Sequence, residues 1–204
     1  MFPSVYDHKT DKLEIHLAVS RDGIHWRFPD QATPLIALGS SGEFDSGSLY
    51  MGQGLVRVGN ELWHYYSGSP LKHEEATVEL LTQPANCRIY SRATLRLDGY
   101  VSAAAGDEEG SFVTPPLRFR GNALTLIVAV RPGGSVRVGL TDAAGQPIPG
   151  ISLADCVPVT GDHVRHKLTW TSNATLAAHA AHPVRLAFRM TKANLFAFQF
   201  TDAD

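Results

Sequence analysis

The sequence predicts an all-β protein. Short runs of alternating apolar and polar residues, separated by Gly, Pro and Asp turns, recur along most of the 204 residues. Such alternation is typical of half-buried strands. Helix signals are confined to residues 73–81 and 173–181, where Ser172 is placed to cap and Leu176 to pack. With 44% hydrophobic and 19% charged residues, the composition indicates folded domains rather than disorder.

Two hairpins are predicted in the first third of the chain. Residues 13–20 alternate as a half-buried strand does, the Asp-Gly pair at 22–23 is a strong turn signal, and Trp26 begins the return strand. The second hairpin covers residues 54–66 and turns at the Gly-Asn pair at 59–60, which suits the positive backbone angles of such turns. These hairpins are blade-like, and two of them cannot close a ring.

Longer strands follow in the second half, with turn signals at 132–134, 142–145 and 149–150. The predicted strands are 111–113, 117–119, 123–130, 135–141, 163–170, 184–190 and 195–200. Turns at this spacing are typical of a β-sandwich. We therefore expect a partial β-propeller of about two blades over residues 1–95, followed by an antiparallel β-sandwich over residues 96–204. Trp26, Trp63 and Trp170 are expected to fill interiors.

The charge pattern argues against several classes of partner. The formal net charge is −2, and the 18 Lys and Arg residues are scattered, so we expect neither nucleic acid nor a membrane surface as a partner. No apolar segment approaches the ~18–20 residues that span a bilayer. The first residues lack the basic and apolar regions of a signal peptide, and the compartment stays open. No phosphate loop or dinucleotide fingerprint is present, so no cofactor is expected.

Thiol and imidazole groups do not indicate a metal site. Cys87 and Cys156 lack the CxxC spacing of zinc ligands. Two buried free thiols are the preferred interpretation, with a disulfide as the alternative. None of the nine histidines has a paired spacing beside a carboxylate, so no transition metal is predicted.

Asp45, Tyr66 and His73 are the candidate substrate-binding residues. Asp45 stands at the entry to a strand, where its carboxylate would accept a sugar hydroxyl; the alternative is an ordinary turn residue. Tyr66 would stack on a sugar ring or pack in the core, and His73 would bind sugar or lie exposed in a loop. Glu43 alternates to the same side as Asp45, but proximity in sequence cannot provide the ~5–9 Å separation of glycosidase carboxylates.

Several motifs carry a family resemblance. They are Ser20-Arg21-Asp22-Gly23-x-x-Trp26, Phe44-Asp45-Ser46-Gly47 and Trp63-x-Tyr65-Tyr66-Ser67-Gly68 in the first part, and Arg96-Leu97-Asp98-Gly99-Tyr100-Val101-Ser102, Thr114-Pro115-Pro116-Leu117, Gly121-Asn122-Ala123-Leu124 and Leu195-Phe196-Ala197-Phe198-Gln199-Phe200 in the second. The first set resembles late blades of the five-bladed propeller glycosidases of glycoside hydrolase families 32 and 43. The second resembles the β-sandwich appended to bacterial proteins of that group.

The resemblance implies acid chemistry on three carboxylates near the propeller channel. None of the motifs that carry them (an early Asn-Asp-Pro, a later Arg-Asp-Pro, a Glu followed by Cys) occurs in this sequence, so no catalytic residue is assigned. The expectation is a C-terminal portion of a glycoside-hydrolase-like protein, which forms one wall of a carbohydrate pocket. The alternative is a non-catalytic carbohydrate-binding or structural β-sandwich module. Open blade edges also predict self-association or pairing with a missing N-terminal half.

Overall fold

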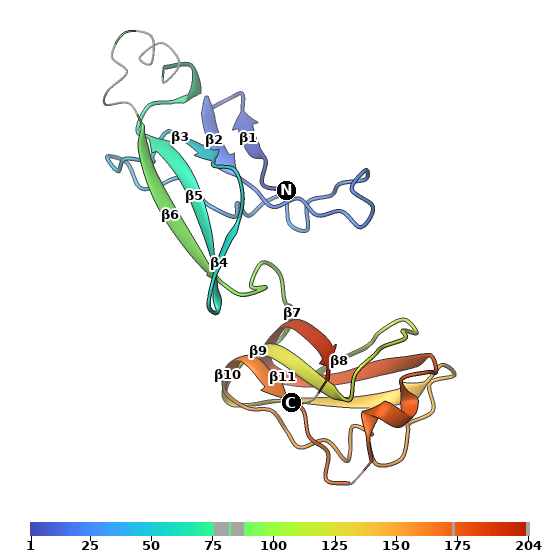
Figure 1. The fold of residues 1–204 in the computed structure, drawn as a ribbon. Helices are drawn as coiled ribbons and strands as arrows, with labels where there is room; N and C mark the ends of the chain where they lie inside the picture. The colour runs from blue at the N-terminus through green and yellow to red at the C-terminus, as the bar shows by residue number, and fades with distance from the viewer. Residues whose placement is uncertain (76–81, 83–87, 173, 203–204) are drawn as a thin grey trace. The chain divides into compact units, whose positions relative to one another are not determined.

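The structure is a computed structural model that describes residues 1–75, 82, 88–172 and 174–202. It divides into two compact units, Met1–Tyr100 and Val101–Asp204. Both units consist of β-sheet (Figure 1). The predicted all-β class is therefore confirmed, and the two sheets are consistent with part of a propeller followed by a sandwich. No helix in the described part of the chain is long and apolar enough to cross a membrane.

The first unit is one six-stranded sheet in the order β1-β2-β3-β5-β4, with β6 on the free edge of β5. The strands are β1 (Ser4–Asp7), β2 (Lys12–Ile15), β3 (Ser48–Met51), β4 (Val56–Val58), β5 (Glu61–Ser69) and β6 (Ile89–Arg96). They form two antiparallel groups, β1–β2 and β3–β6, which a single parallel pair joins at Leu13 and Ser48. This grouping is consistent with the predicted blade-like arrangement.

The second predicted hairpin is present, and the first is reduced to a loop. Strands β4 and β5 turn at Gly59, whose φ of 59° is in the left-handed region that glycine favours. In the first hairpin, Val19 and Arg27 form an isolated antiparallel bridge. Trp26 lies outside any strand and is 42% exposed. The expectation that Trp26 starts a strand and fills an interface is wrong, because only one residue pair closes the loop.

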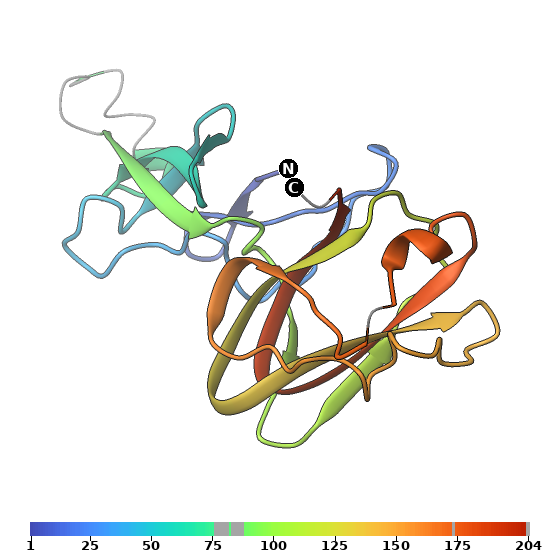
Figure 2. The same cartoon turned by 60° about the horizontal axis from the view of Figure 1, so that its bottom comes forward.

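The second unit is built on two long antiparallel strands, β9 (Ala123–Asp142) and β11 (Val184–Thr201). Strand β10 (Asp162–Lys167) pairs with β9, whereas β7 (Ala103–Ala105) and β8 (Gly110–Val113) pair with β11. Strands β9 and β11 bend together into a curl (Figure 2). A single curled sheet thereby surrounds its own core.

The predicted turn at 132–134 is a bend within β9. The two halves of β9 pair with the two halves of β11, and the register of β11 shifts between Thr191 and Ala193. Gly133 has a φ of 76° and Lys192 a φ of 48°, so both strands kink at the same level. The four strands expected at 123–130, 135–141, 184–190 and 195–200 are therefore two continuous strands, because the bulges bend the ladder without reversing it.

The core of the second unit lies inside this curl. Val136, Val138, Leu140, Leu186 and Phe188 are at most 1% exposed and belong to one cluster. Trp170 packs against it and donates its indole N–H to the Val138 carbonyl over 3.0 Å. The predicted core role of Trp170 is confirmed.

Two further expectations concern this core. Cys156 is a buried free thiol, as predicted, and Cys87 lies outside the described residues. The helical turn expected at 173–181 is the 3₁₀ helix η1 (Leu176–His179) with Leu176 buried. Ser172 does not cap it, since its hydroxyl donates to the Gly150 carbonyl. The other expected helix begins with helical residues 73–75, and residues 76–81 lie outside the described residues.

Candidate functional site

The sheet of the first unit has two different faces. Residues that pair directly across an antiparallel ladder share a face, so Tyr66 lies with Met51 and Ser91 on one face, and Tyr65 with Arg92 on the other. The first face carries the core cluster around Ile15, Leu49 and Tyr66. We call it the core face. The opposite face, with Trp63, Tyr65, Tyr90 and Arg92, is called the open face.

Asp45 and Tyr66 meet on the core face. The Tyr66 hydroxyl donates to Asp45 Oδ2 over 3.0 Å, and both residues are buried. Burial, reinforced by the Asp45 hydrogen bond, raises the pKa of Tyr66. The carboxylate thus has a defined partner inside the protein.

Two glycines make room for the Asp45 side chain. A Cβ added to Gly68 would lie 2.5 Å from Asp45 Cβ, and one added to Gly39 would lie 2.1 Å from Asp45 Oδ1. The Glu43 carboxylate also reaches Gly39, while Glu43 Oε2 accepts the Ser40 backbone N–H over 2.7 Å. Both carboxylates therefore hold the chain at the entry to β3, and the Asp45 carboxylate lies in a closely fitted cradle.

His73 lies apart from this pair, in a cluster of aromatic and charged side chains. Its Nδ1 is hydrogen-bonded to the Tyr50 hydroxyl at 2.5 Å, and its ring centroid is 5.1 Å from that of Tyr6. The Arg88 guanidinium stacks 4.0 Å above the Tyr50 ring. Asp11 accepts from the Tyr6 hydroxyl over 2.8 Å and raises the pKa of Tyr6 to about 12. We call these five residues the tyrosine–histidine cluster.

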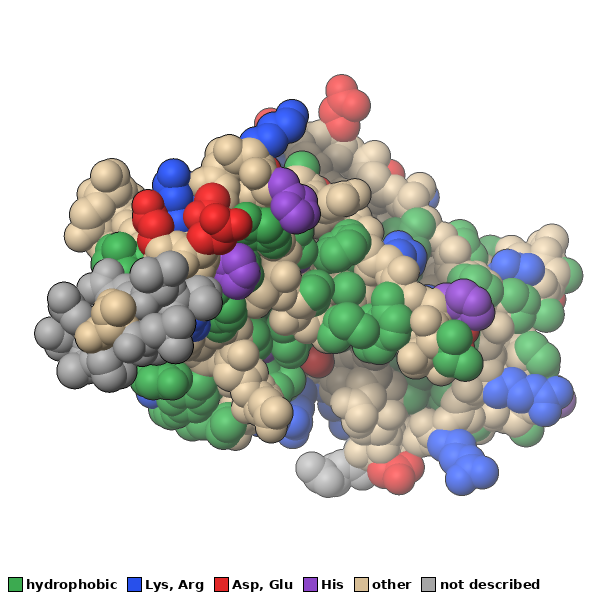
Figure 3. Space-filling model, turned by 90° about the horizontal axis from the view of Figure 1, so that it is seen from above, with side chains coloured by type: hydrophobic (Ala, Val, Ile, Leu, Met, Phe, Trp, Pro, Cys, Tyr) green, Lys and Arg blue, Asp and Glu red, His purple; other side chains and the backbone are tan. Residues whose placement is uncertain are grey.

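The tyrosine–histidine cluster is assembled from distant segments. Tyr6 comes from β1, Tyr50 from β3, and His73 from the chain after β5. Asp11 is held in the β1–β2 turn by a φ of 58°, and its carbonyl accepts the His73 backbone N–H over 2.9 Å. Figure 3 shows histidine, acidic and hydrophobic side chains close together on the face of the molecule in view. Hydroxyl, imidazole, carboxylate and guanidinium groups beside aromatic rings are the groups that recognise polar ligands with apolar faces.

The open face continues from this cluster along β5 and β6. Tyr90 is 84% exposed and Tyr65 is 47% exposed. The Arg92 guanidinium stacks 3.8 Å above Trp63, as Arg88 does above Tyr50. Two stacked arginines and two exposed tyrosines therefore share one face. No signal in the sequence paired β6 with β5.

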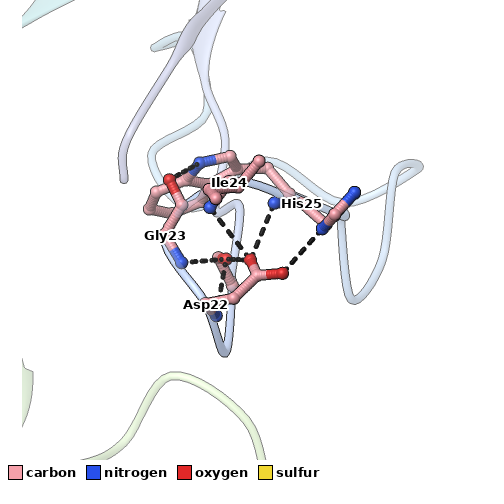
Figure 4. A network of polar contacts seen from close by, with 6 residues as sticks. Asp22, Gly23, Ile24 and His25 are labelled. Carbon is pink, nitrogen blue, oxygen red and sulfur yellow. Dashed lines mark hydrogen bonds and ion pairs between the residues drawn. The ribbon is translucent and has the colours of Figure 1, made fainter.

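The 20–26 loop is a third polar assembly (Figure 4). Asp22 Oδ1 accepts the backbone N–H groups of Ile24 and His25 at 2.9 and 2.8 Å, and Asp22 Oδ2 contacts His25 Nδ1 at 2.6 Å. The Trp26 indole N–H donates to the Gly23 carbonyl over 3.2 Å. The His25 hydrogen bond is the main reason that the pKa of Asp22 lies well below its usual range. The carboxylate is occupied within the loop, so its role is to fix the loop conformation.

Comparisons with known proteins give a distant structural likeness. No protein-family model matches the chain, and no curated protein matches it. A solved structure that it resembles is the glycoside hydrolase family 43 arabinoxylan arabinofuranohydrolase from Bacillus subtilis in complex with cellotetraose, at 13% sequence identity and a TM-score of 0.29. The alignment covers 100% of this chain and 50% of that one. The chain thus spans about half the length of this enzyme, and the likeness is distant.

Proposed function

We propose that this chain is the C-terminal portion of a glycoside-hydrolase-like, carbohydrate-active protein, and that its first unit binds carbohydrate on the open face. The observation that carries the proposal is the exposure of Tyr65 and Tyr90 on the face that also holds Trp63 and Arg92. The sequence motifs of propeller glycosidases support the same class. Binding, rather than hydrolysis, is the activity proposed for this chain.

The spacing of the aromatic side chains fits this role. Residues two apart on a strand lie about 7 Å from each other on one face, so Trp63 and Tyr65 are separated by a distance comparable to a sugar ring. Tyr90 lies diagonally across from Tyr65, because Tyr90 pairs with Ser67 and Tyr65 with Arg92. A flat sugar face stacks on the exposed Tyr65 and Tyr90 rings, and Arg92, which covers the Trp63 ring, donates to its hydroxyl groups.

The tyrosine–histidine cluster supplies the polar end of the proposed site. Its Tyr50 lies on the open face, since Tyr50 and Tyr90 both pair with Ser67. His73 is thus proposed to border the sugar through its bond to Tyr50. For Asp45 and Tyr66 the proposal is a supporting role beneath this face, because the Asp45–Tyr66 bond fixes the chain that enters β3.

Isothermal titration calorimetry tests the proposal with a panel of neutral xylo-, arabino-, cello- and fructo-oligosaccharides. We expect Tyr65→Ala and Tyr90→Ala to weaken binding at least about threefold each, because each removes an aromatic contact. Trp26→Ala is the matched control, since it removes an exposed aromatic side chain of the same unit from outside the open face. Equal losses of affinity in all three variants would contradict the assignment of carbohydrate binding to the open face.

A second pair of variants tests the polar end. Tyr50→Phe removes the hydrogen bond to His73 and is expected to weaken binding. Tyr100→Phe removes a comparable 2.9 Å bond to His64 Nε2 on the core face and is expected to leave affinity unchanged. A concentration-dependent dimer that Tyr65→Ala and Tyr90→Ala abolish in light scattering would instead assign the open face to protein contact and overturn the proposal.

A further inference from the structure

The second unit contains a cavity of about 480 Å³ on the side of β9 and β11 that faces away from the core. Its lining includes Arg137, Leu140, Pro147, Leu153, Ala187 and Arg189. The orientation follows from the alternation along the strands, because Val136, Val138 and Phe188 point into the core and their neighbours point outward. The volume is within the ~300–1,000 Å³ range of small-molecule sites.

Two arginines face each other across this cavity wall. Arg137 of β9 and Arg189 of β11 are direct cross-strand partners. Like charges in this position destabilise a sheet, so the pair needs compensation. The Arg137 Nη1 donates to the neutral Cys156 carbonyl at 2.5 Å, and no carboxylate in the described part of the chain forms an ion pair with it.

Arg189 is only partly compensated. Its Nε lies 3.3 Å from Glu109 Oε1, and both side chains are about half exposed. Exposed pairs of this kind contribute little because water screens them. Arg137 therefore has no ion-paired carboxylate among the described residues, and Arg189 has only this solvent-screened one.

Small residues beside the arginines let the cavity wall approach the sheet. Gly139 and Ala187 are direct cross-strand partners next to the arginine pair. The Leu153 backbone nitrogen lies 2.3 Å from the position of a Cβ on Gly139, so the segment around Leu153 forms the wall of the cavity. Pro147 and Leu153 add apolar surface. The cavity thus combines an apolar body with a cationic end.

We propose that this cavity binds a small carboxylate with an apolar face, about the size of one ring, whose carboxylate is held by Arg137 and Arg189. Guanidinium groups recognise carboxylates through paired, charge-assisted hydrogen bonds. A sugar acid and an aromatic acid share this chemistry. The inference is independent of the open face and of the neutral-sugar binding proposed for it.

Calorimetry with sodium glucuronate, sodium benzoate and glucose tests the inference on the full chain. We expect saturable binding of at least one carboxylate and none of glucose. Arg189→Gln is expected to weaken that binding roughly ten- to hundredfold, as the loss of hydrogen bonds to a charged group predicts. Glu109→Gln is expected to strengthen it, because Glu109 competes for Arg189.

Arg165→Gln is the matched control, because it removes the same charge from an exposed position on β10 outside the cavity. Its affinity for the carboxylate should equal that of the unsubstituted chain. Glucuronate binding alone assigns a sugar acid, and benzoate binding alone assigns an aromatic acid. Absence of binding by both acids, equal binding of glucose, or equal losses in Arg165→Gln and Arg189→Gln would overturn the inference.

Discussion

The hydrogen bond between Tyr66 and Asp45 is expected to stabilise the first unit substantially. Tyr66→Phe removes the hydroxyl that donates to Asp45 Oδ2 over 3.0 Å and leaves a buried carboxylate oxygen without that donor. Hydrogen bonds to charged groups contribute about 1.5–3 kcal/mol, so we expect the free energy of unfolding to fall by about that amount. Space is no obstacle to the substitution, because phenylalanine keeps the ring.

Urea denaturation followed by tryptophan fluorescence measures this effect. Trp26 and Trp63 lie in the first unit and Trp170 in the second, so the fluorescence signal contains contributions from the unfolding of both units. Tyr90→Phe is the matched control. Its ring is 84% exposed, and loss of an exposed hydroxyl should change stability by less than about 0.5 kcal/mol.

A double-mutant cycle with Asp45→Asn isolates the pairwise interaction. If the bond acts as inferred, the two substitutions together should cost less than the sum of the single effects, because each alone already breaks the pair. Additive losses, or a Tyr66→Phe effect as small as that of Tyr90→Phe, would refute the reasoning and leave Asp45 as an ordinary turn residue.

Two other predictions concern titration and close packing. Since the Asp11 hydrogen bond raises the pKa of Tyr6 from 10.0 to about 12, the stability that it provides is present below pH 10 and is lost as the pH rises toward 12. When tyrosine ionisation is followed by phenolate absorbance, Asp11→Asn should therefore move the step at the highest pH to a lower pH. In the second unit, Gly139→Ala should destabilise by about 1–3 kcal/mol, because the new methyl group would lie 2.3 Å from the Leu153 backbone nitrogen.

Each of these predictions has its own control. Gly106→Ala adds a methyl group where no atom lies within 4 Å. The urea concentration at the midpoint of unfolding should therefore fall in Gly139→Ala but not in Gly106→Ala. An absorbance titration of Tyr6→Phe should lack the step near pH 12. If that step persists in Tyr6→Phe, another tyrosine is responsible and the role of Asp11 is wrong.

Local patterns predicted part of the candidate site. The chain around Asp45 and the alternating strand ending in Tyr66 are short-range features, and both residues meet in the structure. The carbohydrate-binding role of Asp45, Tyr66 and His73 stays a prediction. Tyr50 and Arg88 were not predicted as site residues. Their contact depends on the pairing of β3, β5 and β6, and no turn signal in the sequence indicates that these strands pair.

The sequence by itself determined the all-β class and the β4–β5 hairpin and favoured a buried thiol at Cys156, since alternation, turn residues and apolarity act over a few neighbouring residues. Only the tertiary structure decided which strands continue and which faces are open. The segment at 132–134 contains Pro and two Gly, as a turn that reverses the chain does. Strand β9 nevertheless continues through it, because the paired strand β11 bends at the same level, at Lys192. The pairing of distant strands likewise placed Arg137 opposite Arg189 and Tyr90 diagonally across from Tyr65, because register is a property of two chain segments together.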